Sequence, residues 1–405
     1  MIKRPATILA LLTGLNLLNY LDRLVLSAVL PKVRDELALS RFEGGLLATV
    51  FLLGYFVTSP LFGTLGDRYP RKHLIALGIL IWSVATLASG MATSLGTLVA
   101  ARAFVGVGEA SYATLAPTII DDITPPQKKG RALGIFYVAT PIGSALGYLV
   151  GGFVEHRWGW RHAFYVAGGP GIALALVCLF IAEPARKLAT EKPDVVRDIG
   201  SLVKLPLYRF GVLGYCAYTA AIGAFAYWAP EFLYRRYNLD LAVANFRFGI
   251  VVIVAGAIAT WIGGKWADVM RLRVEKVEKE PGQIDRETVR GLLRICAIGS
   301  LIGTPVTIAC FLAPSPNVFF ACAFVAILAL FMSTSPINAV VLKSVPESLR
   351  ASAMALCIFG IHLLGDLWSP PFVGLLADHL PVQLAMMALP VAIGVSAWLW
   401  WPRGA

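Results

Sequence analysis

The sequence predicts an all-α membrane protein, and three observations carry this prediction. Of the 405 residues, 58% are hydrophobic and only 15% are charged, and the mean hydropathy is +0.72. Soluble domains carry about 25% charged residues, so this chain has too little polar surface to fold in water. Its apolar runs have the roughly 20 residues that a helix needs to cross a membrane, and they are too evenly apolar for the roughly 10-residue strands of a membrane barrel.

Twelve such apolar runs are predicted to be transmembrane helices. We place them at residues 6–30, 43–65, 73–92, 95–118, 131–153, 162–182, 207–231, 243–266, 291–312, 317–340, 351–373 and 382–401. The first run begins like a signal peptide, after Lys3 and Arg4, but Asp22 and Arg23 interrupt it and no small-residue cleavage site follows. We therefore predict that it is retained as the first helix.

The net charge is +11, and the uneven distribution of Lys and Arg residues along the chain indicates the membrane topology. If both termini are cytoplasmic, 25 of the 35 Lys and Arg residues lie on the cytoplasmic side, eight lie outside, and Arg23 and Arg102 lie within the membrane. Cytoplasmic loops of membrane proteins are enriched in Lys and Arg. We therefore predict a multi-pass protein of the plasma (inner) membrane with cytoplasmic termini, embedded in the lipid bilayer, and no nucleic-acid partner.

The chain divides into two halves that echo each other. Residues 183–206 are polar and suit a cytoplasmic linker with one surface helix, between six-helix bundles at 1–182 and 207–405. Two motifs recur at matching places: GTLGDRYPRK (63–72) is echoed by GKWADVMR (264–271), and PQKKGR (126–131) by PESLR (346–350). Such weak internal similarity is typical of duplicated transporter folds, whose substrate site lies near the midplane between the repeats.

Four charged residues lie inside predicted membrane helices: Asp22 and Arg23 in the first, Arg102 and Glu109 in the fourth. A charge at membrane depth costs about 2.5 to 3.5 kcal/mol on insertion scales, so charges retained there mark candidate functional sites. Arg102 and Glu109 are separated by two turns, about 10.5 Å, on nearly one helix face. Asp22 is expected near the depth of Arg102, so an ion pair between them is geometrically allowed.

Two interpretations of these charges remain open. Burial raises the pKa of a carboxyl and a nearby arginine lowers it, so an arginine that leaves and returns would switch a carboxylate between proton-binding and proton-releasing states. The alternative is a static salt bridge that orients the two helices. Arg23 points about 100° away from Asp22, and it is expected either to snorkel outward or to pair with a neighbouring helix.

Aromatic and polar side chains in two later helices form a candidate ligand-binding surface. They are Tyr215, Tyr218, Phe225 and Trp228 in the seventh helix, and Ser335 and Asn338 in the tenth. Aromatic rings with a few hydroxyl and amide groups suit an amphipathic ligand, and the alternative for many of them is helix packing. In the eleventh helix, His362 and Asp366 are one turn apart, either as a titrating pair or as a structural hydrogen bond.

Motifs along the chain resemble those of the major facilitator superfamily. GTLGDRYPRKHL (63–74) is similar to its loop signature, and RAFVGVGEA (102–110) is similar to its fourth-helix motif. More narrowly, NYLDR (19–23), VGEASYATLAPTIIDD (107–122), WGWRHAF (158–164) and HLLGDLWSPP (362–371) resemble the spinster family of proton-linked lipid transporters. The resemblance implies twelve transmembrane helices in two pseudo-symmetric six-helix bundles, the major facilitator fold.

The resemblance also implies roles for particular residues. Proton coupling falls to Asp22, Glu109 and Arg102, and Arg102 also contacts the substrate headgroup. Asp67 is expected to face the start of the eleventh helix as part of a cytoplasmic gate, for which the alternative is an exposed basic cluster with a tight turn. The gate candidates are Gly63, Asp67, Arg68, Arg71, Asp268, Arg131 and Arg350.

The predicted function is secondary active transport by alternating access, coupled to protons and acting on an amphipathic lipid such as a lysophospholipid or a sphingosine-1-phosphate-like molecule. The protein is expected to be a monomer. The alternatives are a proton-linked exporter of drugs or small organic solutes, and a membrane lipid sensor that does not transport. No GxSxG, HExxH or GxxxxGK[ST] motif occurs, so no enzymatic activity is expected. The six cysteines lack metal-ligand spacing, and no cofactor or metal is expected.

Overall fold

The computed structural model describes residues 2–125, 128–183, 195–277 and 281–401. Within these ranges the regular structure is helical, with one isolated β-bridge between Ile2 and Ile181 and no named β-strand. Twelve spans of the described chain are long and apolar enough to cross a membrane. The predicted all-α fold class with twelve membrane helices is therefore confirmed.

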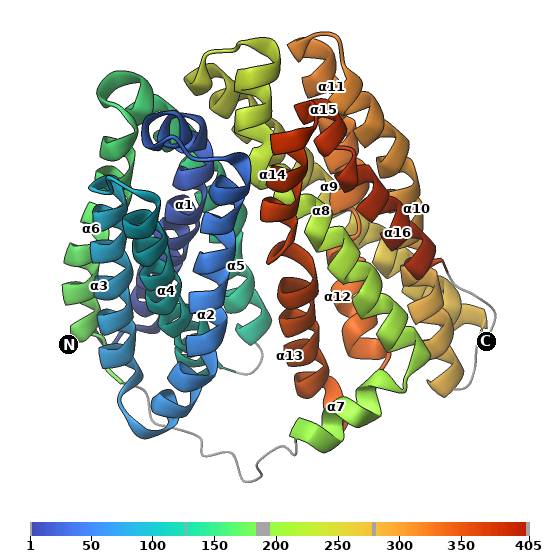
Figure 1. The fold of residues 1–405 in the computed structure, drawn as a ribbon. Coiled ribbons are helices and arrows are strands. Elements are labelled where there is room, and N and C mark those ends of the chain that lie inside the picture. Colours follow the sequence, from blue (N-terminus) through green and yellow to red (C-terminus); the bar gives the residue numbers. More distant parts are fainter. Residues whose placement is uncertain (1, 126–127, 184–194, 278–280, 402–405) are drawn as a thin grey trace. The chain divides into compact units, whose positions relative to one another are not determined.

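The first six spans are unbroken helices (Figure 1). They are α1 (Pro5–Leu37), α2 (Arg41–Arg68), α3 (Arg71–Gly90), α4 (Leu95–Ile123), α5 (Lys129–Trp158) and α6 (Trp160–Leu179). Several extend beyond the predicted apolar runs, and polar residues cap two of them. Ser40 and Ser94 precede α2 and α4, and their hydroxyl groups accept hydrogen bonds from the backbone N–H groups of Glu43 and Thr97.

The later elements are less regular. The linker contains the short helix α7 (Val195–Val203), and its residues 184–194 lie outside the described ranges. The long helices α8 (Pro206–Tyr237), α9 (Leu241–Val277) and α10 (Pro281–Leu312) follow. The tenth span consists of α11 (Pro316–Phe331) and α12 (Thr334–Lys343), and the 3₁₀ turn η2 (Glu347–Leu349) follows it. The eleventh span consists of α13 (Arg350–Ile361), the π-helix η3 (His362–Asp366) and α14 (Ser369–His379). The twelfth consists of α15 (Val382–Ala385) and α16 (Ala388–Trp400).

Proline explains the three interruptions, each of which was predicted as a continuous helix. Pro336, the Pro370–Pro371 pair and Pro390 each follow a break by about one turn. Proline has no N–H group, so the carbonyl four residues earlier loses its helical donor. By contrast, α9 continues to Val277, so the second copy of the loop motif (264–271) lies within a helix and not at its end as predicted.

The chain forms two compact units by its internal contacts. Unit 1 comprises Met1–Ala189 and Tyr227–Ile250, and unit 2 comprises Thr190–Ala226 and Val251–Ala405. The end of α8 and the start of α9 thus group with α1 to α6. Hydrogen bonds support this grouping, because Ser27 donates to the carbonyl of Tyr227 (2.6 Å) and Asn245 donates to that of Ala28 (2.9 Å). The bundle boundaries at 1–182 and 207–405 remain a prediction.

Within unit 1, two glycines of α4 permit close helix crossings. A Cβ atom built on Gly106 would lie 2.0 Å from the carbonyl oxygen of Phe51 in α2, and one built on Gly108 would lie 2.5 Å from that of Gly78 in α3. Any larger residue would therefore push the helices apart. These crossings hold α2 and α3 against the segment of α4 between Arg102 and Glu109.

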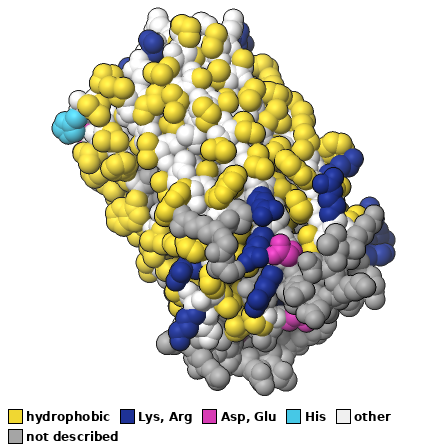
Figure 2. Space-filling model, turned by 90° about the vertical axis from the view of Figure 1, so that its right-hand side faces the viewer, with side chains coloured by type: hydrophobic (Ala, Val, Ile, Leu, Met, Phe, Trp, Pro, Cys, Tyr) yellow, Lys and Arg dark blue, Asp and Glu magenta, His cyan; other side chains and the backbone are white. Residues whose placement is uncertain are grey.

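The surface is suited to lipid. Figure 2 shows a face on which hydrophobic side chains predominate, while Lys and Arg side chains gather mainly towards the lower part of the view. Large apolar side chains such as Trp261, Leu301 and Trp398 in unit 2 are exposed. A soluble monomer rarely exposes so much apolar surface, which agrees with the membrane prediction.

Candidate functional site

The four charged residues predicted within the membrane lie together in unit 1. Asp22, Arg102 and Glu109 are 0%, 2% and 0% exposed, and the side chain of Arg23 is 19% exposed. Asp22 and Arg23 lie at the middle of α1, while Arg102 and Glu109 lie on α4. We refer to these four residues as the charge cluster.

The ion pair of the charge cluster joins Arg23 to Glu109. The Nε atom of Arg23 donates to Oε2 of Glu109 at 2.5 Å. The guanidinium carbon of Arg23 lies 4.9, 5.0 and 5.3 Å from the ring centroids of Tyr20, Phe51 and Tyr55, so cation–π attraction also stabilises the charge. Of the two orientations expected for Arg23, the structure has the one that pairs with a neighbouring helix.

Asp22 has a neutral partner. The hydroxyl group of Thr86 in α3 donates to Oδ2 of Asp22 at 2.6 Å. Among the described residues no ion pair within 4.0 Å joins Asp22 to Arg102, so the pair that the spacing allowed does not form here. Arg102 is still close enough to interact electrostatically with Asp22, and its guanidinium carbon lies 5.1 Å from the ring centroid of Phe51.

Several buried polar atoms of the charge cluster have no hydrogen-bond partner in the protein. They are Nε and Nη1 of Arg102, Oδ1 of Asp22 and Oε1 of Glu109. An unsatisfied buried donor or acceptor costs about 1 to 3 kcal/mol, and more when the group is charged. The cluster is therefore chemically suited to further partners: an anionic group on the guanidinium of Arg102 and protons on the two carboxylates.

The gate candidates of the first half divide into one buried residue and several accessible ones. Arg71 is buried, and its guanidinium group bonds Asp122 (2.7 Å), Glu183 (3.1 Å) and Thr118 (3.0 Å). These contacts join the start of α3 to the end of α4 and to the segment after α6, all within unit 1. Gly63 is half-buried, whereas Asp67, Arg68 and Arg131 are exposed.

The gate candidates of the second half lie in unit 2. Arg350 bonds locally, to the carboxylate of Glu347 (2.8 Å) and to the carbonyl of Leu342 (3.1 Å), and Asp268 is exposed on α9. Residues 126 and 127 of the matching first-half motif lie outside the described ranges. The expected contact between Asp67 and the eleventh span remains a prediction.

Half of the candidate ligand-binding surface is buried by packing. Tyr218 donates to the carbonyl of Leu330 (3.1 Å), and the ring of Phe225 lies 5.6 Å from that of Phe311. Trp228 is also buried, and it belongs to unit 1.

Three members of that surface are half-buried in unit 2, namely Tyr215, Ser335 and Asn338. The ring centroid of Tyr215 lies 6.0 Å from that of Tyr218, and Asn338 donates to the carbonyl of Thr334 (2.8 Å). These three side chains are therefore better placed to meet a ligand than the buried ones.

Sequence reasoning missed a second buried ionic group, centred on Glu231. This residue is 1% exposed, forms an ion pair with Arg34 and lies 3.7 Å from Arg41. Next to it Asp35 pairs with Arg235. These contacts join α1 and α2 to the end of α8 within unit 1. The sequence feature that could have indicated this group is an acidic residue, Glu231, at the very end of the predicted apolar run 207–231.

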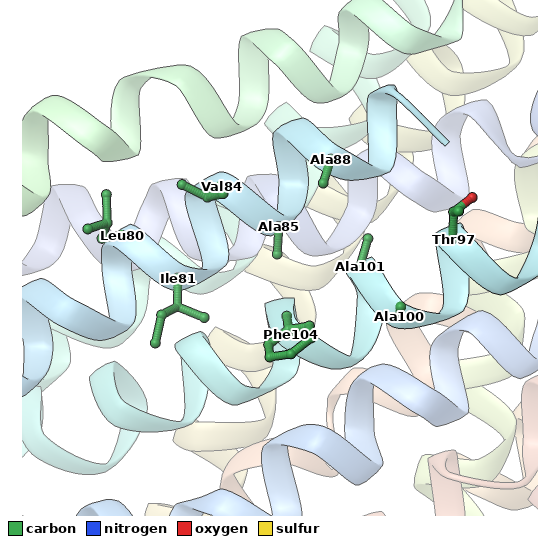
Figure 3. A pocket seen from close by; sticks show the side chains of 9 residues that line it. All are labelled: Leu80, Ile81, Val84, Ala85, Ala88, Thr97, Ala100, Ala101 and Phe104. Atoms are coloured by element: carbon green, nitrogen blue, oxygen red, sulfur yellow. The ribbon is translucent and has the colours of Figure 1, made fainter. Parts of the chain in front are cut away.

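An apolar groove with a volume of about 540 Å³ lies between α3 and α4 (Figure 3). Its lining includes Leu80, Val84 and Phe104, and Thr97 is the one polar residue among the nine that line it. No residue of the charge cluster lines this groove. It is thus distinct from the candidate site.

Comparison with known proteins agrees with this architecture. The sequence profile of the Major Facilitator Superfamily matches residues 12–276. Protein spinster of Drosophila melanogaster is 33% identical over 384 residues, which cover 91% of this chain and 61% of that protein. Protein spinster homolog 1 of Homo sapiens is 33% identical over 406 residues, which cover 93% of this chain and 74% of that protein.

Solved structures share the fold. A bacterial homolog to the human lysosomal transporter spinster, in an inward-facing and unoccupied conformation, has a TM-score of 0.83 at 22% identity, covering 98% of this chain and 96% of that chain. The D-xylose-proton symporter has a TM-score of 0.76 at 19% identity, covering 98% of this chain and 97% of that chain. At these identities the likeness concerns the fold alone.

This chain belongs to the major facilitator superfamily of membrane proteins, because the profile of that superfamily matches residues 12–276. The twelve spans and the buried charges of α1 and α4 agree with this membership. Within that superfamily it belongs to the spinster family, because its relatives named spinster are 33% identical over most of its length. The resemblance seen in the sequence motifs is confirmed at both levels.

Proposed function

We propose that this protein is a secondary active transporter that moves an amphipathic lipid across the membrane by alternating access. Family membership supports this proposal, as do two relatives: a probable sphingolipid transporter of Arabidopsis thaliana at 29% identity and the sphingosine-1-phosphate transporter SPNS2 of Danio rerio at 30%. The substrate class is a lysophospholipid or a sphingosine-1-phosphate-like molecule. An enzymatic activity is not proposed.

The unpartnered guanidinium of Arg102 is the observation that carries the substrate class. A buried cation with two free donors requires an anionic partner, and a phosphate oxygen pair matches the planar fork of arginine. We propose that Arg102 contacts the headgroup. In unit 2, Tyr215, Ser335 and Asn338 remain candidate residues for ligand binding, because their side chains are half-buried.

Proton coupling is proposed for Glu109 and Asp22. Protonation of Glu109 removes the negative charge that pairs with Arg23, and the aromatic rings of Tyr20, Phe51 and Tyr55 still stabilise the released guanidinium. The loss of one ion pair therefore does not leave a buried cation unsupported. In this scheme Arg23 is the arginine that leaves the carboxylate of Glu109 and returns to it, and Arg102 is available to the ligand.

Binding should strengthen with the length of the acyl chain, by up to about 0.8 kcal/mol for each buried methylene group. We would measure dissociation constants for lysophospholipids of eight to eighteen carbons, using protein in nanodiscs, with glycerophosphate as the tail-free control. A flat response would contradict a lipid site and favour the small-solute exporter. Tight binding without flux in liposomes would instead favour a lipid sensor.

Alternating access can be tested with two matched ion pairs at the end of α1. Asp35 pairs with Arg235 of α8, and Glu36 pairs with Arg161 of α6, with side chains between 31% and 51% exposed in both cases. Helix α8 continues into unit 2, whereas α6 does not. A short bifunctional thiol reagent should therefore block lipid flux in the Asp35→Cys/Arg235→Cys variant and leave it intact in Glu36→Cys/Arg161→Cys. Full flux in a quantitatively cross-linked first variant would rule out movement at this contact.

We also propose that the protein lies in the plasma (inner) membrane as a monomer with both termini cytoplasmic. The same variants test this orientation of the termini. A membrane-impermeant reagent should cross-link both cysteine pairs in intact cells. Five of the six native cysteines are buried and Cys322 is half-buried, so background labelling should be low. Cross-linking that requires permeabilised cells would reverse the orientation.

A further inference from the structure

The apolar groove between α3 and α4 lies at membrane depth (Figure 3). Both helices are membrane spans, over Arg71–Gly90 and Leu95–Ile123, and both belong to unit 1. A space of about 540 Å³ is within the range of ligand sites, although the charge cluster contributes no residue to it. The groove therefore calls for an occupant of its own.

Small side chains leave this space open. The two helices are in close contact at Gly78, where an added Cβ atom would lie 2.6 Å from the carbonyl oxygen of Gly108. Beyond this contact, Ala85 of α3 and Ala101 of α4 line the groove, and they are only 6% and 7% exposed. Figure 3 shows their methyl groups pointing toward each other between the helices. These two residues form the floor of the groove.

The rim of the groove is apolar and exposed. Leu80 and Val84 of α3 and Phe104 of α4 are 42%, 51% and 59% exposed. Leu77, which is 50% exposed, continues the same face of α3 at helical spacing. On a helix that spans a membrane, a face of this kind is in contact with the hydrocarbon of the bilayer.

The length of the groove matches one leaflet of the bilayer. Helix α4 rises about 10.5 Å from Thr97 to Phe104, and α3 rises about 12 Å from Leu80 to Ala88. Thr97 is two residues from the start of its span, so the groove runs inward from a membrane boundary. The hydrocarbon layer is about 30 Å thick, so one leaflet is about 15 Å. An acyl chain that enters at this boundary would lie along the groove for most of its length.

The chemistry of the lining selects hydrocarbon over water and over a headgroup. A trapped water molecule needs about two to four polar partners. The one hydroxyl group of the lining, that of Thr97, already donates to the carbonyl of Ser94 (2.9 Å). A phosphate or an ammonium group would be costly here, because none of the nine lining residues is charged. An acyl chain needs neither a polar nor a charged partner.

We propose that this groove holds one acyl chain of a resident bilayer phospholipid, at a site separate from that of the transported lipid. The headgroup lies at the membrane surface, beside the connection between α3 and α4. The floor adjoins the charge cluster, because Ala85 precedes Thr86, which bonds Asp22, and Ala101 precedes Arg102. The bound chain thus packs against the helix turns that position these polar groups. The inference does not depend on the proposed transport function.

A phosphatidylcholine with a diazirine in one acyl chain tests this site. The protein is purified in mild detergent with this lipid, irradiated and mapped by peptide mass spectrometry. We expect adducts to concentrate on residues 80–104 and to saturate at one lipid per protein as the lipid concentration rises. Equal labelling of other exposed apolar faces, such as that around Leu176 of α6, would overturn the proposal.

Two phenylalanine variants make the labelling specific. Ala100→Phe places a ring in the groove, and Ala173→Phe places the same ring at an exposed position of α6 that does not line it. Each methylene group displaced from the groove lowers the affinity about fourfold. Labelling of residues 80–104 should therefore fall by at least about tenfold in Ala100→Phe and stay at the wild-type level in Ala173→Phe. Wild-type labelling in folded Ala100→Phe would overturn the proposal, and Ala88→Phe tests it from α3 if Ala100→Phe does not fold.

Two more variants separate this site from other occupants. Folded Arg102→Ala should keep full labelling of residues 80–104, and a loss would assign that labelling to the transported lipid. Val84→Cys should remain monomeric under oxidation, and a disulfide-linked dimer would show that a second copy of the chain covers the groove. Absence of lipid flux in the wild-type protein would count against the proposed transport function, and the labelling would still decide the resident lipid.

Discussion

Replacing Arg102 with alanine should abolish lipid flux and weaken the binding of phosphate-bearing lysolipids by at least about a hundredfold. A hydrogen bond to a charged group contributes about 1.5 to 3 kcal/mol, and two donors of Arg102, Nε and Nη1, have no partner within the protein. Their loss removes the proposed anchor for the headgroup. Dissociation constants in nanodiscs, with and without the phosphate on the ligand, measure the effect directly.

Two further variants make the Arg102 result specific. Arg102→Lys keeps the charge but not the planar fork, so its binding should be intermediate. Arg157→Ala removes an exposed guanidinium at the end of α5 and should bind as the wild type. The headgroup role is wrong if Arg102→Ala, folded and monodisperse, binds lysolipids with and without phosphate as the wild type does.

The fold could be predicted because membrane spans are recorded in the sequence as apolar runs. The ends of the helices were harder, since a helix continues through polar residues that an apolar window excludes, as α1 does through Arg34. The breaks in the last three spans were missed because proline is ambiguous. Pro336 follows a break, whereas Pro60 and Pro141 lie in continuous helices. Inside a bundle, neighbouring helices decide whether the freed carbonyl is tolerated.

The residues of the charge cluster were predictable, but their partners were not. A charge in an apolar run is visible in one dimension, and helical spacing gives its direction relative to its own helix. Which helix it meets depends on packing. Arg23 of α1 meets Glu109 of α4, and Asp22 of α1 meets Thr86 of α3, so each contact joins two different helices. Spacing within one helix therefore could not choose between Arg23 and Arg102 as the partner of an acid.

The buried ionic group around Glu231 shows the same limit. Glu231, Arg34 and Arg41 come from three segments of the chain, and each reads alone as a charge at the end of a span. Only the fold brings them together and buries Glu231. The chain thus contains a second buried acid with arginine partners for which no role in proton coupling is proposed. Glu231 is therefore a suitable control for Glu109.

Glu109→Gln should abolish transport driven by a pH gradient while exchange of labelled lipid across liposomes survives. Glutamine has the shape of the protonated acid and can still accept a hydrogen bond from Nε of Arg23, so the binding site should persist without a titrating group. We expect gradient-driven flux to fall by at least about tenfold. Asp22→Asn, which keeps an acceptor for the hydroxyl of Thr86, tests the second carboxylate in the same way.

Glu231→Gln is the matched control for Glu109→Gln, because both acids are buried and both pair with an arginine. Each substitution removes the carboxylate charge from a buried ion pair, so both variants should melt at a lower temperature than the wild type. Only Glu109→Gln should also lose the dependence of flux on the pH gradient. If both variants lose stability and both keep that dependence, the pair of Arg23 and Glu109 is a static bridge between α1 and α4, and the protons must be carried elsewhere.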